Sequence, residues 1–223
     1  MRFHVLTAVS LLALMVVYAG ATSDAAQFST GVQAGFNGGL SFRASGMVAE
    51  FARGFPLGLE LGVGHTRYDP GDPAAARKIF INDATNGTPE KSGWAWDLRF
   101  DFLYDVNLLQ ASKLYLYGGV RYSMFTANFS FIGGNEDFDV TSSQWGLGLG
   151  AKGLFAVSNS IDFSVAAGFD NYFKNTLKGH DTSYSPDGLD VNGRNDYTFE
   201  DADQAVNQPG FQPLFMIGVA YRF

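Results

Sequence analysis

The 223-residue chain contains no cysteine, only three histidines and few charged side chains (17%). The absence of cysteine excludes disulfides, thiolate catalysis, cysteine-based zinc sites and a lipidated N-terminal cysteine. The net charge of −7 comes without any cluster of lysine or arginine, and a nucleic-acid partner needs such a cluster to contact phosphates. The composition therefore leaves few routes to enzymatic chemistry and argues against binding to nucleic acid.

Long hydrophobic runs are also scarce, and the only one lies at the N-terminus. Arg2 precedes an apolar stretch over residues 5–18, and Ala19 and Ala21 occupy the small positions of a signal-peptidase site. A membrane-anchoring helix, the alternative, needs roughly 20 apolar residues. The pattern predicts a signal peptide at 1–21 that is cleaved on export, and one barrel domain at 22–223.

Glycine (27), phenylalanine (21) and tyrosine (10) are abundant, as is typical of β-structure. The C-terminal stretch FQPLFMIGVAYRF places apolar side chains at every second position, which is the period of a β-strand. The same period recurs along the chain and predicts eight strands. Their expected ranges are 27–37, 46–53, 57–68, 94–106, 114–130, 144–157, 161–174 and 211–223. Beyond Met124 the alternation breaks, which predicts a β-bulge.

The gaps between these strands alternate in length. Three are short (54–56, 107–113 and 158–160), and the intervening ones are mostly longer (38–45, 69–93, 131–143 and 175–210). Short turns at one end and long loops at the other are typical of outer-membrane barrels, whose short turns face the periplasm. We call these two ends the turn end and the loop end.

The two faces of the strands differ in chemistry. In WAWDLRFDFLYDV every second side chain is apolar, and Asp97, Arg99 and Asp101 lie on the opposite face. An arginine near the bilayer midplane costs about 2–4 kcal/mol, so the charged face is expected to line the lumen. The same argument over all strands predicts a lumen charge network of Glu50, Glu60, Asp97, Arg99, Asp101, Arg121, Lys152, Asp162, Asp170, Lys174 and Arg222.

Aromatic side chains gather near the expected strand ends, as the two interface belts of a membrane barrel do. The expected membrane-interface aromatics are Trp94, Trp96 and Trp145 at the loop end, and Tyr104, Tyr221 and Phe223 at the turn end.

With these features the chain resembles the small outer-membrane β-barrel superfamily of Gram-negative bacteria, the OmpA transmembrane-domain and OmpX-like group. The resemblance implies an all-β, eight-stranded antiparallel up-and-down transmembrane β-barrel in the outer membrane. It also implies outer-membrane lipids and lipopolysaccharide as partners, and recognition of the C-terminal strand, with Tyr221 and Phe223, by the barrel-assembly machinery. The soluble alternative, a lipocalin-like periplasmic barrel, would turn the aromatic face inward.

Function is expected in the long extracellular loops 69–93 and 175–210, as a structural or surface-interaction role with an unassigned ligand. Eight strands leave a lumen just wide enough for side chains, which favours a plug; inward glycines favour the alternative, a narrow porin-like channel. A lipid-modifying enzyme is the third reading, but His65 and His180 lie in no catalytic motif. Neither a metal site nor a cofactor is predicted: the acidic loop 175–210 does not match a calcium-binding loop.

Overall fold

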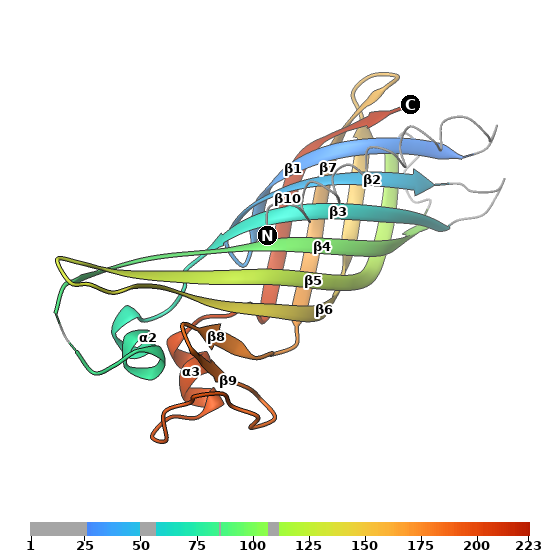
Figure 1. The fold of residues 1–223 in the computed structure, drawn as a ribbon. Helices are drawn as coiled ribbons and strands as arrows, with labels where there is room; N and C mark the ends of the chain where they lie inside the picture. The colour runs from blue at the N-terminus through green and yellow to red at the C-terminus, as the bar shows by residue number, and fades with distance from the viewer. Residues whose placement is uncertain (1–25, 50–56, 85, 107–111) are drawn as a thin grey trace.

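The computed structural model describes residues 26–49, 57–84, 86–106 and 112–223 (Figure 1). The predicted signal peptide and Glu50 lie outside these ranges. No helix within them is long and apolar enough to cross a membrane.

Eight antiparallel strands form a closed barrel, which confirms the predicted fold class. Each strand pairs with its neighbours in sequence, β1 pairs with β10, and the β5–β6 pairing completes the ring. The barrel strands are β1 (Gln27–Asn37), β2 (Leu40–Ala49), β3 (Leu57–Tyr68), β4 (Thr88–Asp105), β5 (Ser112–Ile132), β6 (Asp137–Ala156), β7 (Ile161–Tyr172) and β10 (Phe211–Arg222).

Three neighbouring strands are much longer than a bilayer requires. A membrane strand needs about 9–11 residues, whereas β4 has 18, β5 has 21 and β6 has 20. Figure 1 shows their far ends extending beyond the rest of the barrel as one sheet. The surplus residues therefore form a platform outside the membrane at the loop end.

The platform carries a second layer built from the two long connections. One contains α2 (Pro73–Phe80), and the other contains β8 (Leu177–Gly179), β9 (Thr182–Tyr184) and α3 (Phe199–Ala205). Strand β8 pairs with β6, so the platform continues into this connection. We call the platform together with residues 69–87 and 173–210 the lobe.

Capping defines where the two helices of the lobe begin. The Asp72 side chain accepts hydrogen bonds from the backbone N–H groups of Ala74 and Ala75 at the start of α2. Thr198 and Asp201 form a reciprocal capping box at the start of α3.

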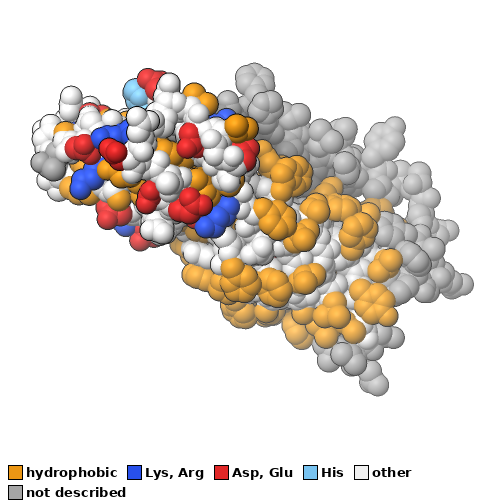
Figure 2. All heavy atoms as spheres, turned by 90° about the horizontal axis from the view of Figure 1, so that it is seen from below, with side chains coloured by type: hydrophobic (Ala, Val, Ile, Leu, Met, Phe, Trp, Pro, Cys, Tyr) orange, Lys and Arg blue, Asp and Glu red, His pale blue; other side chains and the backbone are white. Residues whose placement is uncertain are grey.

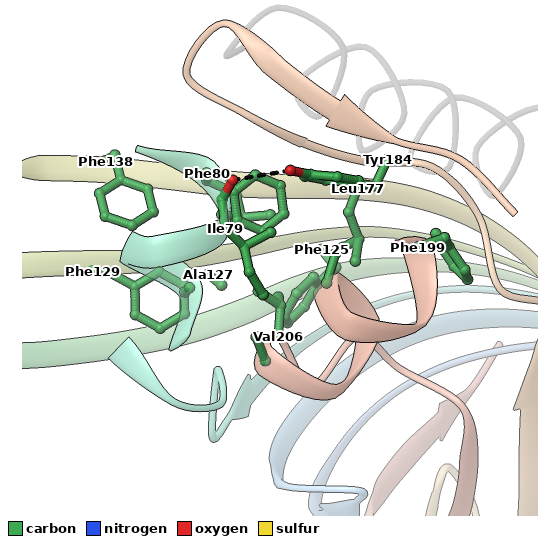
Figure 3. Packing of buried hydrophobic residues seen from close by; sticks show 14 of the residues in the cluster. Ile79, Phe80, Phe125, Ala127, Phe129, Phe138, Leu177, Tyr184, Phe199 and Val206 are labelled. Atoms are coloured by element: carbon green, nitrogen blue, oxygen red, sulfur yellow. Dashed lines mark hydrogen bonds between the residues drawn. The ribbon is translucent and has the colours of Figure 1, made fainter. Parts of the chain in front are cut away.

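The lobe has its own apolar core, formed between the inward face of the platform and the two helices (Figure 3). Phe125, Ala127 and Phe129 of β5 are at most 1% exposed in it. Tyr184 packs its ring against Phe80 and donates a hydrogen bond to the Ile79 carbonyl oxygen at 3.1 Å. The two long connections are therefore folded structure and not loose loops.

The predicted bulge after Met124 is wrong. The pairing of β5 with β4 and with β6 runs without interruption from one end to the other. The alternation changes because the inward side chains switch from polar to apolar where the strand leaves the barrel and packs against the lobe.

Two predicted loops are also wrong. Residues 40–45 belong to β2, and a tight turn at Gly38 and Gly39 replaces the expected loop 38–45; Gly38 has a φ of +69° that favours glycine. The expected loop 131–143 shrinks to residues 133–136, because β5 and β6 both continue into the platform.

Candidate functional site

Two arginines and two aspartates form a ring of ion pairs in the middle of the lumen. Arg121 places its Nη1 2.8 Å from Asp101 Oδ1 and its Nε 2.7 Å from Asp170 Oδ1. Arg99 places its Nε 2.9 Å from Asp101 Oδ2 and its Nη1 3.6 Å from Asp170 Oδ2. All four side chains are at most 4% exposed. Since Asp170 lies on β7 and the other three lie on β4 and β5, the ring ties strands across the lumen.

Further polar contacts lie on both sides of this ring. Asp97 accepts hydrogen bonds from the hydroxyls of Tyr172 at 3.2 Å and Thr66 at 3.4 Å. Towards the turn end, Lys152 of β6 reaches Glu60 of β3 at 2.7 Å. These buried charges are thereby paired or hydrogen-bonded, which offsets the cost of removing them from water.

Inward glycines make room for these long side chains. A Cβ added at Gly148 would lie 2.1 Å from Asp170 Oδ1 and 2.2 Å from Arg121 Nη2, and one at Gly168 would lie 2.6 Å from the Tyr117 hydroxyl. At these positions, the space that the sequence suggested for water is occupied by Arg121 and Tyr117.

Arg43 is a lumen residue that the sequence analysis missed. It is 7% exposed and lines a small polar cavity with Asn37, Ser41, Asp97 and Tyr172, among others. The cavity measures about 10 Å³, which is room for about one water molecule. The alternation Leu40-Ser41-Phe42-Arg43 is the pattern of a strand, but it falls within the predicted loop 38–45.

Apolar layers close the lumen on both sides of the charged ring. Towards the turn end, buried Leu103, Tyr115 and Leu154 belong to a hydrophobic cluster inside the barrel. At the loop end Phe125 is 1% exposed, and the Tyr68 hydroxyl donates to Gln212 Oε1 at 2.9 Å. Among the described residues, apolar side chains therefore lie on both sides of the polar interior.

The structure places the predicted lumen charges in three groups. Eight have buried side chains: Glu60, Asp97, Arg99, Asp101, Arg121, Lys152, Asp162 and Asp170. Arg222 lies at the turn end with its side chain 37% exposed and its Nε 2.9 Å from Asp162 Oδ2. The assignment of Lys174 is wrong: it follows the end of β7, is 62% exposed and pairs with Asp203 of α3.

The predicted interface aromatics lie on the outward face of the strands, in two groups. At the loop end Trp96 packs edge-on against His65, and Trp145 packs against Tyr122. At the turn end Tyr104 is 49% exposed and Phe223 is 68% exposed; Tyr221 packs against Phe223. Figure 2 shows hydrophobic side chains covering the barrel surface, as a lipid-facing wall requires.

The lobe surface, by contrast, is charged, and Figure 2 shows basic and acidic side chains side by side there. Arg194 reaches Asp83 at 2.8 Å, and Lys91 reaches Asp69 at 2.6 Å. The hydrogen bond from Lys91 lowers the pKa of the Asp69 carboxyl. The ion pair with Asp203 raises the pKa of the Lys174 ammonium. These pairs hold the two long connections to each other and to the platform.

One buried arginine links three parts of the lobe. Arg77 of α2 is 1% exposed, donates to the Asn86 carbonyl at 2.8 Å and to Asn86 Oδ1 at 2.9 Å, and lies 4.5 Å above the ring of Phe131. Its Nη2 is 3.7 Å from Glu136 in the β5–β6 turn. The tip of the platform is therefore fixed to α2.

The two histidines lie in separate environments. His65 is on the outward wall beside Trp96, and His180 forms the β8–β9 turn with a φ of 49° and faces Asp181 at 3.3 Å. Among the described residues, no group of three or more His, Asp or Glu side chains is arranged to hold a metal ion.

Comparison with known proteins finds similarity among solved structures. No protein-family model matches the chain, and no curated protein matches it. A major outer membrane protein from Thermus thermophilus aligns with 27% identity and a TM-score of 0.73, over 89% of this chain and 100% of that one. Neisserial surface protein A aligns at 12% identity and a TM-score of 0.41, over 89% of this chain and 96% of its own. Ail of Yersinia pestis aligns at 14% and 0.44, over 91% and 100%.

The alignment with the Thermus protein spans that whole chain, and the closed barrel with its apolar outer wall and polar interior has the architecture of such proteins. The chain is a small outer-membrane β-barrel protein with eight barrel strands.

Proposed function

We propose that this outer-membrane barrel is a structural anchor that presents the lobe at the cell surface for interaction with an external partner. The observation that carries the proposal is the apolar core of the lobe, in which Phe125, Phe129 and Tyr184 are at most 1% exposed. A connection that only joined two strands would not need a core of this kind.

The barrel is further proposed not to conduct. The ring of ion pairs, the apolar layer around Leu103 and Tyr115, and the cavity of about 10 Å³ all support a plug over the channel alternative. A conducting path needs a continuous polar route wide enough for water, and a space for about one molecule is too small for that.

Catalysis is not part of the proposal. His65 packs edge-on against Trp96 on the outward wall, the face that the barrel turns to lipid. The lipid-modifying alternative predicts palmitoyl transfer or lipid hydrolysis by the purified protein that is lost in His65→Ala. Turnover with that dependence would replace the proposed role with an enzymatic one.

The barrel wall implies a lipid environment, and further partners belong to the proposal. We expect export through the cleaved segment 1–21 into the outer membrane of a Gram-negative bacterium, and contact with lipopolysaccharide. The barrel-assembly machinery is proposed to read the C-terminal strand, where Tyr221 and Phe223 lie outward at the turn end.

Single-channel recording in planar bilayers tests the anchor against the channel. The purified protein is expected to give no steady conductance, both intact and with residues 175–210 replaced by a short linker. Steady, ion-selective conductance of the intact protein would contradict the plug. Conductance that arises only after the replacement would mean that the lobe is a lid over a pore.

Proteolysis of intact cells tests the surface exposure. A protease added outside the cells should cut the lobe, for example after the exposed Lys178, while the barrel stays intact. If cleavage required permeabilisation of the outer membrane, the lobe would face the periplasm and a role at the surface would be untenable.

A further inference from the structure

In the part of the barrel that the structure describes, the outward wall carries a single arginine or lysine side chain. Along the described parts of the eight strands, the outward positions are apolar, aromatic, small or uncharged except for His65, Arg67 and three acids of the platform. Those three acids are Glu90, Asp137 and Asp139. Arg67 is therefore the only outward arginine or lysine in these strands.

Arg67 lies at the boundary between the lipid-facing wall and the platform. Its strand neighbours are Leu40 on β2 and Trp94 on β4. Leu40 is 58% exposed, as a lipid-facing side chain is, whereas beyond Trp94 the outward positions of β4 become Ser92 and Glu90. This is the level at which aromatic side chains of membrane barrels meet the lipid headgroups.

The Arg67 guanidinium is exposed and makes no hydrogen bond or ion pair with any described residue. The acid two positions along the chain, Asp69, is already engaged by Lys91 at 2.6 Å and by the Gly71 backbone N–H at 3.1 Å. Three basic side chains of the lobe, Lys91, Lys174 and Arg194, do have acidic partners. Arg67 thus combines an unpaired charge with a place on the outward wall of the barrel.

An unpaired guanidinium at the edge of the hydrocarbon layer is expected to place its charge among the lipid headgroups. Its stem can lie along the apolar wall while its planar head reaches the headgroup layer. There it can bind a phosphate through two parallel N–H···O hydrogen bonds, and the indole N–H of an adjacent tryptophan supplies a further donor.

We propose that Arg67 and Trp94 form a binding site for the phosphate of an anionic lipid headgroup at the loop end of the barrel. The exposed aliphatic side chain of Leu40 beside them is expected to contact the acyl chain of the same lipid. A lipid satisfies the charged and the apolar parts of this surface together, and a free phosphate ion satisfies only the first.

The protein contains a convenient reporter, because Trp94 is one of only three tryptophans. The double variant Trp96→Phe/Trp145→Phe keeps Trp94 alone. It is folded into phosphatidylcholine vesicles that contain increasing fractions of phosphatidylglycerol with brominated acyl chains. Quenching of the fluorescence then measures how strongly the anionic lipid is preferred next to Trp94, and the heat-dependent gel shift verifies that each variant is folded.

The expected preference for phosphatidylglycerol is about threefold to tenfold, which is typical of one partly exposed charge-assisted contact. Arg67→Gln should reduce this preference to about onefold, so that the two lipids are bound equally well. Arg67→Lys, which keeps the charge but loses the planar fork, should give an intermediate value. The preference should also fall as the salt concentration rises.

The matched control is the variant with Trp145 alone, Trp94→Phe/Trp96→Phe. Trp145 lies beside Tyr122 on the same outer belt and has no outward arginine or lysine on its own strand or on a paired barrel strand. It should show no lipid preference, with or without Arg67. A preference at Trp94 that survives Arg67→Gln, an equal preference at Trp145, or no preference at Trp94 would each overturn the site.

Discussion

Gly148 offers a direct test of the idea that the lumen is filled by a specific ring of ion pairs. Gly148→Ala adds a single methyl group at a point 2.1 Å from Asp170 Oδ1 and 2.2 Å from Arg121 Nη2. Each of these two atoms must move by about 1 Å or more to reach ordinary van der Waals distance. The Arg121–Asp170 ion pair, 2.7 Å long and 1% exposed at both ends, cannot keep its geometry.

The expected loss of stability in Gly148→Ala can be estimated from two typical costs. Inserting a methyl group into a packed interior costs about 1–3 kcal/mol, and breaking a buried ion pair by removing one partner costs about 3–5 kcal/mol. Arg121 keeps its second partner, Asp101, at 2.8 Å, so the pair is displaced and not lost. The free energy of unfolding should therefore fall by about 2–3 kcal/mol.

Gly64→Ala is the matched control. Gly64 also faces the lumen and lines the small cavity beside Arg121 and Asp170, but an added Cβ would lie 3.5 Å from the Phe42 carbonyl oxygen and 3.9 Å from Asp97 Cβ, which is ordinary contact. Its effect should stay within about 0.5 kcal/mol. Urea unfolding of the barrel in lipid vesicles, followed by tryptophan fluorescence, measures both variants. Equal stabilities of the two variants would refute the proposed role of the ion-pair ring.

Three further predictions concern the lobe. Arg77→Ala should destabilise the lobe by about 2–4 kcal/mol, because it removes the buried hydrogen bonds to Asn86 and the contact with Phe131; limited proteolysis should then cut the lobe faster than in the unaltered protein, while the heat-dependent gel shift of the barrel is unchanged. Tyr184→Phe should cost about 1 kcal/mol through loss of its hydrogen bond to Ile79, seen as faster amide exchange in α2. Hydrogen bonds from the Thr198 backbone and hydroxyl lower the pKa of Asp201 below 3.8, so its contribution to α3 is present above that pH and disappears as the pH falls through the lowered value. Amide exchange in α3 should therefore show less protection at about pH 2 than at about pH 5, after correction for the intrinsic exchange rate.

The barrel could be predicted from the sequence because each of its strands obeys one simple rule. Lipid excludes charge, so the positions of Asp97, Arg99 and Asp101 fix the register of β4, and a shift by one residue would turn all three outward. The same rule does not say which charges pair. The contact of Arg121 with Asp170 depends on how β5 and β7 face each other across the lumen, which the spacing within one strand does not encode.

Errors arose where that rule stops applying. Lys174 continues the alternation of β7 in sequence, but the strand ends at Tyr172 and the lysine pairs with Asp203 instead. Arg43 is the opposite case: the Gly38–Gly39 turn is so tight that β2 begins at Leu40, inside the range 38–45 that the length of an ordinary loop suggested.

Along β5, the inward and outward faces exchange their polar and apolar side chains. This exchange explains why the lobe was not predicted from the sequence, and it shows how a similar lobe could be predicted in another protein. Inside the barrel, the outward side chains Val120 and Tyr122 are apolar or aromatic, and the inward Arg121 is charged. Further along, the outward residues become Thr126 and Asn128, and the inward ones become Phe125, Ala127 and Phe129. Both faces change at the same level because the outer solvent changes there from lipid to water, while the inner face gains an apolar partner. A strand that keeps its period of two but inverts its faces therefore indicates where it leaves the membrane and starts to build a folded domain outside it.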